Sequence, residues 1–209
     1  MSISTKGPAY RIKTERTIVR CWCPKDAPLL KEAIDSSLDH LRPWMPWAEN
    51  EPEDVSAKID RIRRFRGRFD LGEEFVYGIF DLDETIVIGG TGLHRRVGPD
   101  AFEIGYWIRA DQINRGLATE VSAALTKVAF EIQGVNRVEI HCDPNNLRSA
   151  AVPRKLGYTH EATLRDRIRL PDGSYRDSMI WTLLRRDYPR SEAASANIEA
   201  FDVLDKRVL

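Results

Sequence analysis

The feature that most restricts how this chain can fold is a strand-like segment that passes through a glycine into a strongly periodic helix. Residues 102–108 (FEIGYWI) have the aromatic and β-branched composition of a strand. Beyond Gly116, apolar residues recur at spacings of four, four, three and four, which places them on one helix face: Leu117, Val121, Leu125, Val128 and Ile132. Gly134 is a typical residue for the end of such a helix. The segment therefore predicts a strand followed directly by a buried helix.

Strands and helices alternate along the rest of the chain. The pattern predicts further strands at residues 17–22, 74–80, 85–93, 137–142 and 179–184. Asp172 and Gly173 indicate a hairpin between the last strands. This alternation is typical of the α/β or α+β class.

Three more helices are expected. The first begins at Pro24 and ends at the prolines of RPWMPW (residues 42–47), with one apolar face made of Leu30, Ile34, Leu38 and Leu41. The second begins near Pro52, with an apolar face made of Val55, Ile59, Ile62 and Phe65 or Phe69. The third is short and covers residues 147–156. The opposite face of the second helix is rich in arginine (RIRRFRGR), which is typical of a solvated surface and also compatible with an acidic substrate or RNA.

Composition excludes several classes of protein. The chain has 209 residues, with 32 basic and 32 acidic side chains, so no net field favours nucleic acid or an anionic membrane. Three cysteines in this pattern make neither a disulfide framework nor a zinc site, so no metal is expected. The start, MSISTKGPAYRIKTERT, lacks the apolar core of a signal peptide, and no apolar run approaches membrane-spanning length. We therefore expect a cytoplasmic protein without a membrane segment.

The segment QINRGLATE (residues 112–120) is the first candidate for a binding site. A helix start leaves N–H groups unpaired and carries a partial positive charge. Gly116 and Ala118 keep side chains away from this backbone, so a phosphate could reach the N–H groups there, and Arg115 could add a contact. The spacing matches neither a P-loop nor the GxGxxG motif. When the glycine is considered alone, a simple tight turn explains it better than a phosphate site does.

Two neighbouring segments support a ligand rather than a turn. Strand alternation puts Glu103, Gly105 and Trp107 on one face, and a glycine in mid-strand allows close approach by a ligand or by another backbone. A second polar helix start follows the strand at 137–142 and carries Asn146 and Ser149. Two such helix starts at neighbouring strand ends suit an extended, phosphorylated ligand.

These segments also carry a resemblance to a known family. QINRGLATE is similar to the pyrophosphate loop of the GNAT superfamily of N-acetyltransferases, and DPNNLRSAAVPRKLGY resembles the next family block. HLRPWMPW resembles the Rim-type branch, which acetylates the N-termini of ribosomal proteins. The resemblance covers residues 8–188. It implies a mixed, mostly antiparallel sheet that splays at its centre, just beyond Gly105, and is flanked by helices.

The resemblance also implies a co-substrate, acetyl-coenzyme A, and residues that bind it. The loop backbone would hold the pyrophosphate, the strand at 104–108 would pair with the pantetheine arm, and Asn146 would hold that arm. The residues in these roles are Ile104, Tyr106, Trp107, Ile108, Arg115, Gly116, Leu117, Ala118, Thr119, Asn146 and Ser149. Ser149 stands where relatives carry the group that protonates the departing thiolate, although many relatives use a tyrosine for this.

The chemistry of amine acetylation requires a base, and two residues are candidates. Glu103 is the first because it shares a face with Gly105, and His94 at the end of the preceding strand is the second. Each has a simpler explanation: an exposed strand carboxylate, and an ordinary surface histidine. Ser149 could merely bond the helix backbone. Cys142 is interpreted as strand packing, because direct transfer in a ternary complex needs no covalent nucleophile.

The remaining expectations concern the acceptor and the chain's partners. Trp44 and Trp47 are either core aromatics or one wall of an acceptor cleft. Pro153 either bends its helix at the site or falls in a first turn too short to matter. A protein N-terminus is the expected acceptor. A small-molecule amine, a larger acyl group, a non-catalytic sensor and a nucleic-acid module built on RIRRFRGR are the alternatives. Residues 189–209 are expected to be a flexible tail or to dock on a partner subunit, which leaves a homodimer open.

Overall fold

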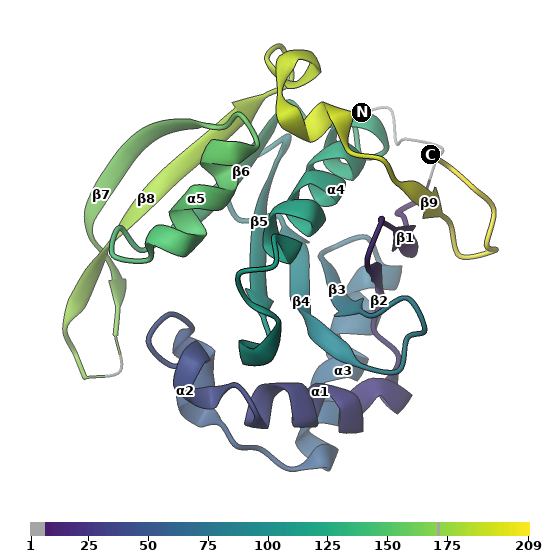
Figure 1. Ribbon diagram of the computed structural model, residues 1–209, viewed down its shortest axis with the longest axis vertical. Helices are drawn as coiled ribbons and strands as arrows, with labels where there is room; N and C mark the ends of the chain where they lie inside the picture. The colour runs from purple at the N-terminus through teal and green to yellow at the C-terminus, as the bar shows by residue number, and fades with distance from the viewer. Residues whose placement is uncertain (1–6, 171) are drawn as a thin grey trace.

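The computed structural model describes residues 7–170 and 172–209, which form one mixed sheet with helices around it (Figure 1). The strand order in this part of the chain is β7-β8-β6-β5-β4-β3-β2-β1-β9. The strand bounds are β1 Arg11–Lys13, β2 Ile18–Cys21, β3 Phe75–Phe80, β4 Val87–His94, β5 Ala101–Ile108, β6 Arg137–Cys142, β7 Thr159–Arg169, β8 Tyr175–Leu184 and β9 Glu199–Phe201. All neighbouring strands are antiparallel except β5 and β6. The predicted fold class, a mostly antiparallel mixed sheet flanked by helices, is confirmed.

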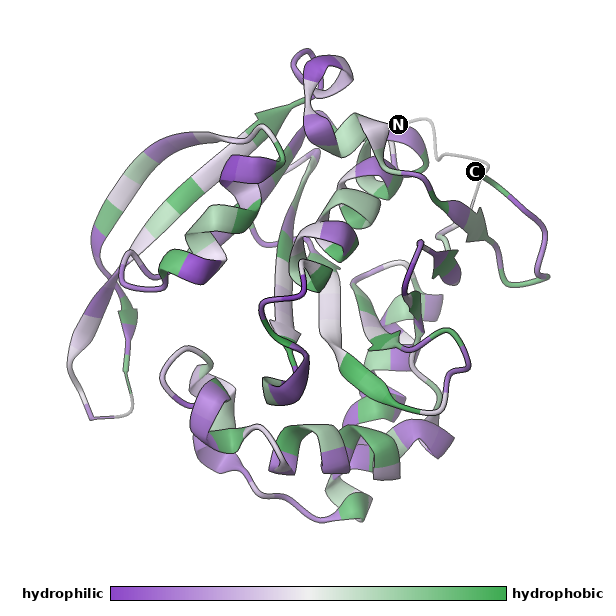
Figure 2. Ribbon diagram, viewed as in Figure 1, coloured by the Kyte–Doolittle hydropathy of each residue, from purple (hydrophilic) through white to green (hydrophobic). Residues whose placement is uncertain are grey.

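The helices form two groups. Their bounds are α1 Ala27–Asp35, α2 Leu38–Leu41, α3 Val55–Asp70, α4 Leu117–Glu131 and α5 Leu147–Lys155. In Figure 1, α4 and α5 lie side by side in front of the sheet, whereas α1, α2 and α3 gather at the opposite end of the molecule. Figure 2 shows apolar and polar residues mixed along α1 and α4, as amphipathic helices require. The periodic helix predicted after Gly116 is α4.

The core divides along the two faces of β5. Phe102, Ile104 and Ile108 are buried in the larger cluster with α4. Trp107, on the other face, packs against a smaller cluster around Trp22, α1 and α3. Since side chains alternate across a strand, one strand reaches both compartments.

The sheet opens between β5 and β6. Pairing is confined to three positions and ends at Glu103 and Glu139, although β5 continues to Ile108 and β6 to Cys142. The splay expected just beyond Gly105 therefore begins two residues earlier. Beyond it, the edge of β5 that faces β6 has no strand partner.

Several elements of the described chain were not predicted from the sequence, and two helices were predicted as one. The single helix expected over residues 24–41 is interrupted at Ser36 and Ser37, where the Ser37 hydroxyl accepts a hydrogen bond from the Ala110 N–H at 3.0 Å. The hairpin expected at Asp172 and Gly173 is confirmed by the antiparallel pair β7 and β8. The bounds of β7 were not predicted, because most of its residues are exposed and polar. Strands β1 and β9 have only three residues each. The short 3-10 helix at Pro46–Asn50 was also missed.

The C-terminal segment packs on the chain's own core. The expectation for 189–209 was a flexible tail or one docked on a partner. Instead, β9 pairs with β1, and Ile198 and Ala200 are buried with the α4 cluster. Lys127 on α4 donates to the carbonyl of Ala196 at 3.0 Å. This part of the chain was hard to predict because its buried positions are small or isolated.

We expect Ile198→Ala to lower the free energy of unfolding by about 2–4 kcal/mol, because it opens a cavity in the main core. The matched control is Val203→Ala in the same segment, where the side chain is 60% exposed and the change should stay within about 0.5 kcal/mol. Chemical denaturation of both variants measures this. Equal, near-zero effects would mean that the segment is detached in solution.

Candidate active site

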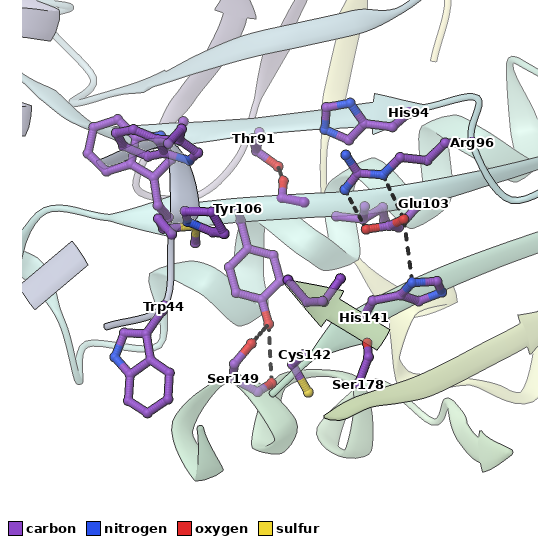
Figure 3. A pocket seen from close by; sticks show the side chains of 18 of the residues that line it. Trp44, Thr91, His94, Arg96, Glu103, Tyr106, His141, Cys142, Ser149 and Ser178 are labelled. Atoms are coloured by element: carbon purple, nitrogen blue, oxygen red, sulfur yellow. Dashed lines mark hydrogen bonds and ion pairs between the residues drawn. The ribbon is translucent and has the colours of Figure 1, made fainter. Parts of the chain in front are cut away.

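A cavity of about 940 Å³ lies where β5 and β6 separate. Its walls come from strands β3 to β8, from helices α1 and α3, from the start of α5 and from the segment at residues 44–47. Figure 3 shows that His94, Arg96 and Glu103 gather at one side of it, and that Tyr106 and Ser149 face each other at another. The cavity therefore brings together residues from both faces of β5.

The loop before α4 presents unpaired amides. Gly116 is the N-cap of α4 with a φ of +79°, and Asn114 has a φ of +61°. In the described part of the chain, no acceptor is paired with the N–H groups of residues 115–119. Among the described residues, and leaving aside the backbone next to Gly116, a Cβ built there would have one atom within 4 Å, and it belongs to Arg16. Successive amides around left-handed residues at a helix start form a concave anion site.

Asn146 and Ser149 shape the start of α5. The Asn146 Oδ1 accepts a hydrogen bond from the Ser149 N–H at 3.1 Å, which makes Asn146 the N-cap. The Ser149 Oγ lies 3.1 Å from the Tyr106 hydroxyl. Burial raises the pKa of Tyr106, so this phenol stays protonated at neutral pH. Ser149 thus does more than bond its own helix, because its hydroxyl meets that of Tyr106 inside the cavity.

Pro153 has a specific consequence at this point. A proline at this position cannot donate a helix bond to the carbonyl of Ser149, four residues earlier. The Tyr106 hydroxyl donates to that carbonyl instead, at 3.2 Å. The proline therefore leaves open the acceptor that holds Tyr106 beside the Ser149 hydroxyl.

Glu103 is buried and paired. Its side chain is only 8% exposed, and both of its oxygens accept from Arg96, at 2.7 and 2.5 Å. The His141 Nδ1 lies 3.5 Å from the Glu103 Oε2, and the His141 Nε2 lies 2.6 Å from Glu139. Glu103 was expected to share a strand face with Gly105, and both line the cavity. The alternative, that Glu103 is an exposed strand carboxylate, is wrong.

His94 lies over the glycines of the sheet. A Cβ on Gly92 or Gly105 would be 2.8 or 3.2 Å from the His94 Nε2. The space above Gly105, which was expected to admit a ligand or a backbone, therefore holds the His94 ring. His94 is not an ordinary surface histidine, since its side chain is 17% exposed and its Nδ1 lies 2.6 Å from the Glu74 Oε1.

The contact with Glu74 fixes the state of the His94 ring. The hydrogen bond with His94 lowers the pKa of Glu74, against the opposing effect of burial. An ionised carboxylate only accepts hydrogen bonds, so the His94 Nδ1 carries a hydrogen. In the neutral ring the Nε2 is then the unprotonated nitrogen, and it faces the cavity.

The aromatic residues of RPWMPW line the cavity. Trp47 packs edge-on against Trp107, with ring centroids 6.1 Å apart, and Trp44 also lines the cavity. Arg176 on β8 donates to the Trp44 carbonyl at 3.1 Å and lies 3.7 Å from Asp143. The wall made by this turn is thus held to the β7–β8 hairpin.

The arginines of α3 are mostly engaged within the chain. Arg61 pairs with Glu51 and Glu53, beside a fully buried contact between Lys58 and Glu51. Three further contacts are Arg63 with Asp60, Arg66 with Asp70 and Arg68 with Glu74. This pairing explains the arginine-rich pattern without an acidic partner.

Cys142 is buried, and burial raises the pKa of its thiol, so it is not a prepared nucleophile.

Sequence reasoning missed several residues of the site. Arg96, Glu74 and Arg176 were not singled out, because each acts through a contact with a residue of another strand or turn. His141 was the one with a local signal, since it lies two residues after Glu139 on the same strand face.

In residues 7–170 and 172–209, no helix is long and apolar enough to cross a membrane.

Known proteins resemble this chain along most of its length. The acetyltransferase (GNAT) domain matches residues 16–159. The [ribosomal protein uS5]-alanine N-acetyltransferase of Escherichia coli (strain K12) is 28% identical over 87% of this chain and 94% of its own. The putative ribosomal N-acetyltransferase YdaF of Bacillus subtilis (strain 168) is 30% identical over 83% of this chain and 94% of its own.

The fold is shared with solved structures. RimJ of Mycobacterium smegmatis, in complex with CoA-disulfide, superposes with a TM-score of 0.76 and 24% identity over 92% of this chain and 93% of that one. The expected resemblance to the GNAT superfamily is thus confirmed: this protein belongs to the GNAT family of acetyltransferases, and its relatives include ribosomal-protein N-acetyltransferases.

Proposed function

We propose that this enzyme transfers an acetyl group from acetyl-coenzyme A to the α-amine of a protein N-terminus, by direct attack in a ternary complex. The observation that carries the proposal is the edge of β5 beyond Glu103, which has no strand partner among the described residues, together with the unpaired amides at the start of α4, the helix that packs on β5. The names of the relatives support a protein acceptor. The presence of both unpaired amides and an open strand edge supports acetyl-coenzyme A as the acetyl donor.

The residues present fit the coenzyme. The N–H groups of residues 115–119 would hold its diphosphate, and residues 104–108 would pair with its pantetheine arm as an added strand does. Asn146 at the start of α5 would border the same arm. Bound there, the coenzyme supplies a thioester carbonyl at the opening of the sheet.

The residues on the other face of β5 would orient and deprotonate the amine. His94 would take the proton through its Nε2, with Glu74 holding the ring and stabilising its charged form. Glu103, the first expectation for this role, has both oxygens engaged by Arg96, which favours His94 and leaves Glu103 to orient the cationic amine or a water. An N–H of the open β5 edge would stabilise negative charge on the carbonyl oxygen.

The leaving thiolate would meet the hydroxyl pair on the coenzyme side. The Ser149 Oγ and the Tyr106 hydroxyl are 3.1 Å apart, so a proton given up by one can be replaced by the other. Trp44 and Trp47 would form one wall for the acceptor. The β7–β8 hairpin, held to that wall by Arg176, would form another.

A small-molecule amine is the second candidate acceptor. The contact of Arg176 with the Trp44 carbonyl bridges two walls of the cavity, and a bridged cavity favours a compact ligand. Cytoplasmic location and a homodimer remain expectations of the same proposal.

Thiol release from acetyl-coenzyme A should separate the acceptors. We expect turnover with peptides that begin with Ser, Ala or Met, and none with aminoglycosides, polyamines or free amino acids. Peptides acetylated beforehand at the α-amine are the control for attack by lysine side chains. Turnover on small amines alone would establish the second candidate, and coenzyme binding without turnover on any amine would refute the catalytic proposal.

Gly116→Glu should abolish coenzyme A binding, because it places a carboxylate where the diphosphate would lie. It also strains a residue with a φ of +79°, so Gly134→Glu, with a φ of +74° just beyond the other end of α4, is the matched control. Calorimetric titration with coenzyme A should show normal affinity for the control only. Equal affinity in both variants would contradict the loop assignment.

His94→Gln should lower kcat by about 10²–10⁴-fold with little change in coenzyme A affinity, because it removes the base. Glu103→Gln should lower turnover less, and His160→Gln, which changes an exposed histidine on β7, should leave it unchanged. A larger loss of kcat in Glu103→Gln than in His94→Gln would assign the base to Glu103.

A further inference from the structure

The turn between β1 and β2 reaches across to the start of α4. Arg16 in this turn donates from Nη1 to the Arg115 carbonyl at 2.8 Å. Its Nη2 lies 3.6 Å from the position of a Cβ on Gly116. The guanidinium is therefore beside the unpaired amides, although Arg16 is about 100 residues distant in the chain.

The contact with the Arg115 carbonyl fixes one of these amides. That carbonyl and the Gly116 N–H belong to one planar, trans peptide, in which the two groups point in opposite directions. Holding the carbonyl toward Arg16 therefore turns the Gly116 N–H away from it. Glycine at φ +79° leaves this peptide free to rotate, so an external anchor is needed to hold it.

The same guanidinium neutralises a carboxylate in the first turn of α4. Glu120 accepts from the Arg16 Nε at 2.6 Å, from the Arg16 main-chain N–H at 3.0 Å and from the Thr14 hydroxyl at 2.6 Å. A first-turn carboxylate is favoured by the helix dipole. It would nevertheless repel an anion bound to the amides one turn earlier, unless a cation cancels its charge.

We propose that Arg16 is a positioning residue for the coenzyme diphosphate: it orients the Arg115–Gly116 peptide and cancels the charge of Glu120. This inference rests on the proposed binding of coenzyme A at the start of α4. It adds Arg16, from the turn between β1 and β2, to the residues of the loop before α4 that would bind the diphosphate. The Thr14 hydroxyl, which holds the other oxygen of Glu120, completes the support.

The test compares equilibrium binding of coenzyme A with that of acetyl-pantetheine, which lacks the diphosphate. We expect Arg16→Ala to weaken coenzyme A about tenfold or more, as loss of charge-assisted contacts predicts, and to leave acetyl-pantetheine unchanged. The double variant Arg16→Ala/Glu120→Gln should bind coenzyme A more tightly than Arg16→Ala, because the repelling charge is gone. Arg63→Ala, which removes another exposed arginine with one acidic partner, is the control.

Arg16→Lys covers the case in which Arg16→Ala folds poorly, since it keeps the charge and loses the fork that holds the Arg115 carbonyl. It should give an intermediate affinity. Wild-type affinity in Arg16→Ala, equal weakening of both ligands, or no recovery in the double variant would each overturn the proposal. A wild-type protein that binds coenzyme A but acetylates nothing would refute the proposed reaction, and the binding of the variants would still decide the role of Arg16. A wild-type protein that does not bind coenzyme A would refute both proposals.

Discussion

The early end of pairing between β5 and β6 is the constraint on which the rest of the site depends. The two strands share only three paired positions, and each then continues alone. On the side of β4, residues 104–108 are paired with a strand. On the side of β6, this edge of β5 has no strand partner among the described residues, and the gap connects the two faces of the sheet. Tyr106 and Ser149 reach it from the side of α4 and α5, while His94 and Glu103 reach it from the other.

The lack of a side chain at certain positions shapes the cavity as much as the side chains that are present. Gly92 and Gly105 leave the space occupied by the His94 ring, and Gly90 leaves space for the Trp107 indole, whose Nε1 would be 2.5 Å from a Cβ there. Pro153 removes a helix donor, and the Tyr106 hydroxyl takes its place at the Ser149 carbonyl. In each case, a group that is missing from one residue leaves room for the ring or hydroxyl of another residue. Such complementarity holds the rings and hydroxyls in place before any ligand binds.

The local parts of the fold could be predicted from sequence. The spacing of apolar residues identified α4, and Gly134, with a φ of +74°, does follow its end. The bounds of strand β7 could not be predicted from apolar spacing, because most of its residues are exposed and polar. The first helix was drawn too long, because nothing local indicated that Ser37 binds the Ala110 amide. For the same reason the docking of β9 on β1 was not foreseen.

The sequence by itself determined the class of the molecule and the segments that bear the chemistry. It did so because helix periodicity, glycine at a helix start and the block DPNNLRSAAVPRKLGY are all local in the chain. Only the tertiary structure decided the surroundings of each residue. It buried Glu103 against Arg96 and turned His94 toward Glu74, 20 residues earlier. It also set Arg16 beside Gly116. Contacts between distant segments depend on the register of the whole sheet, and no short stretch of sequence encodes that register.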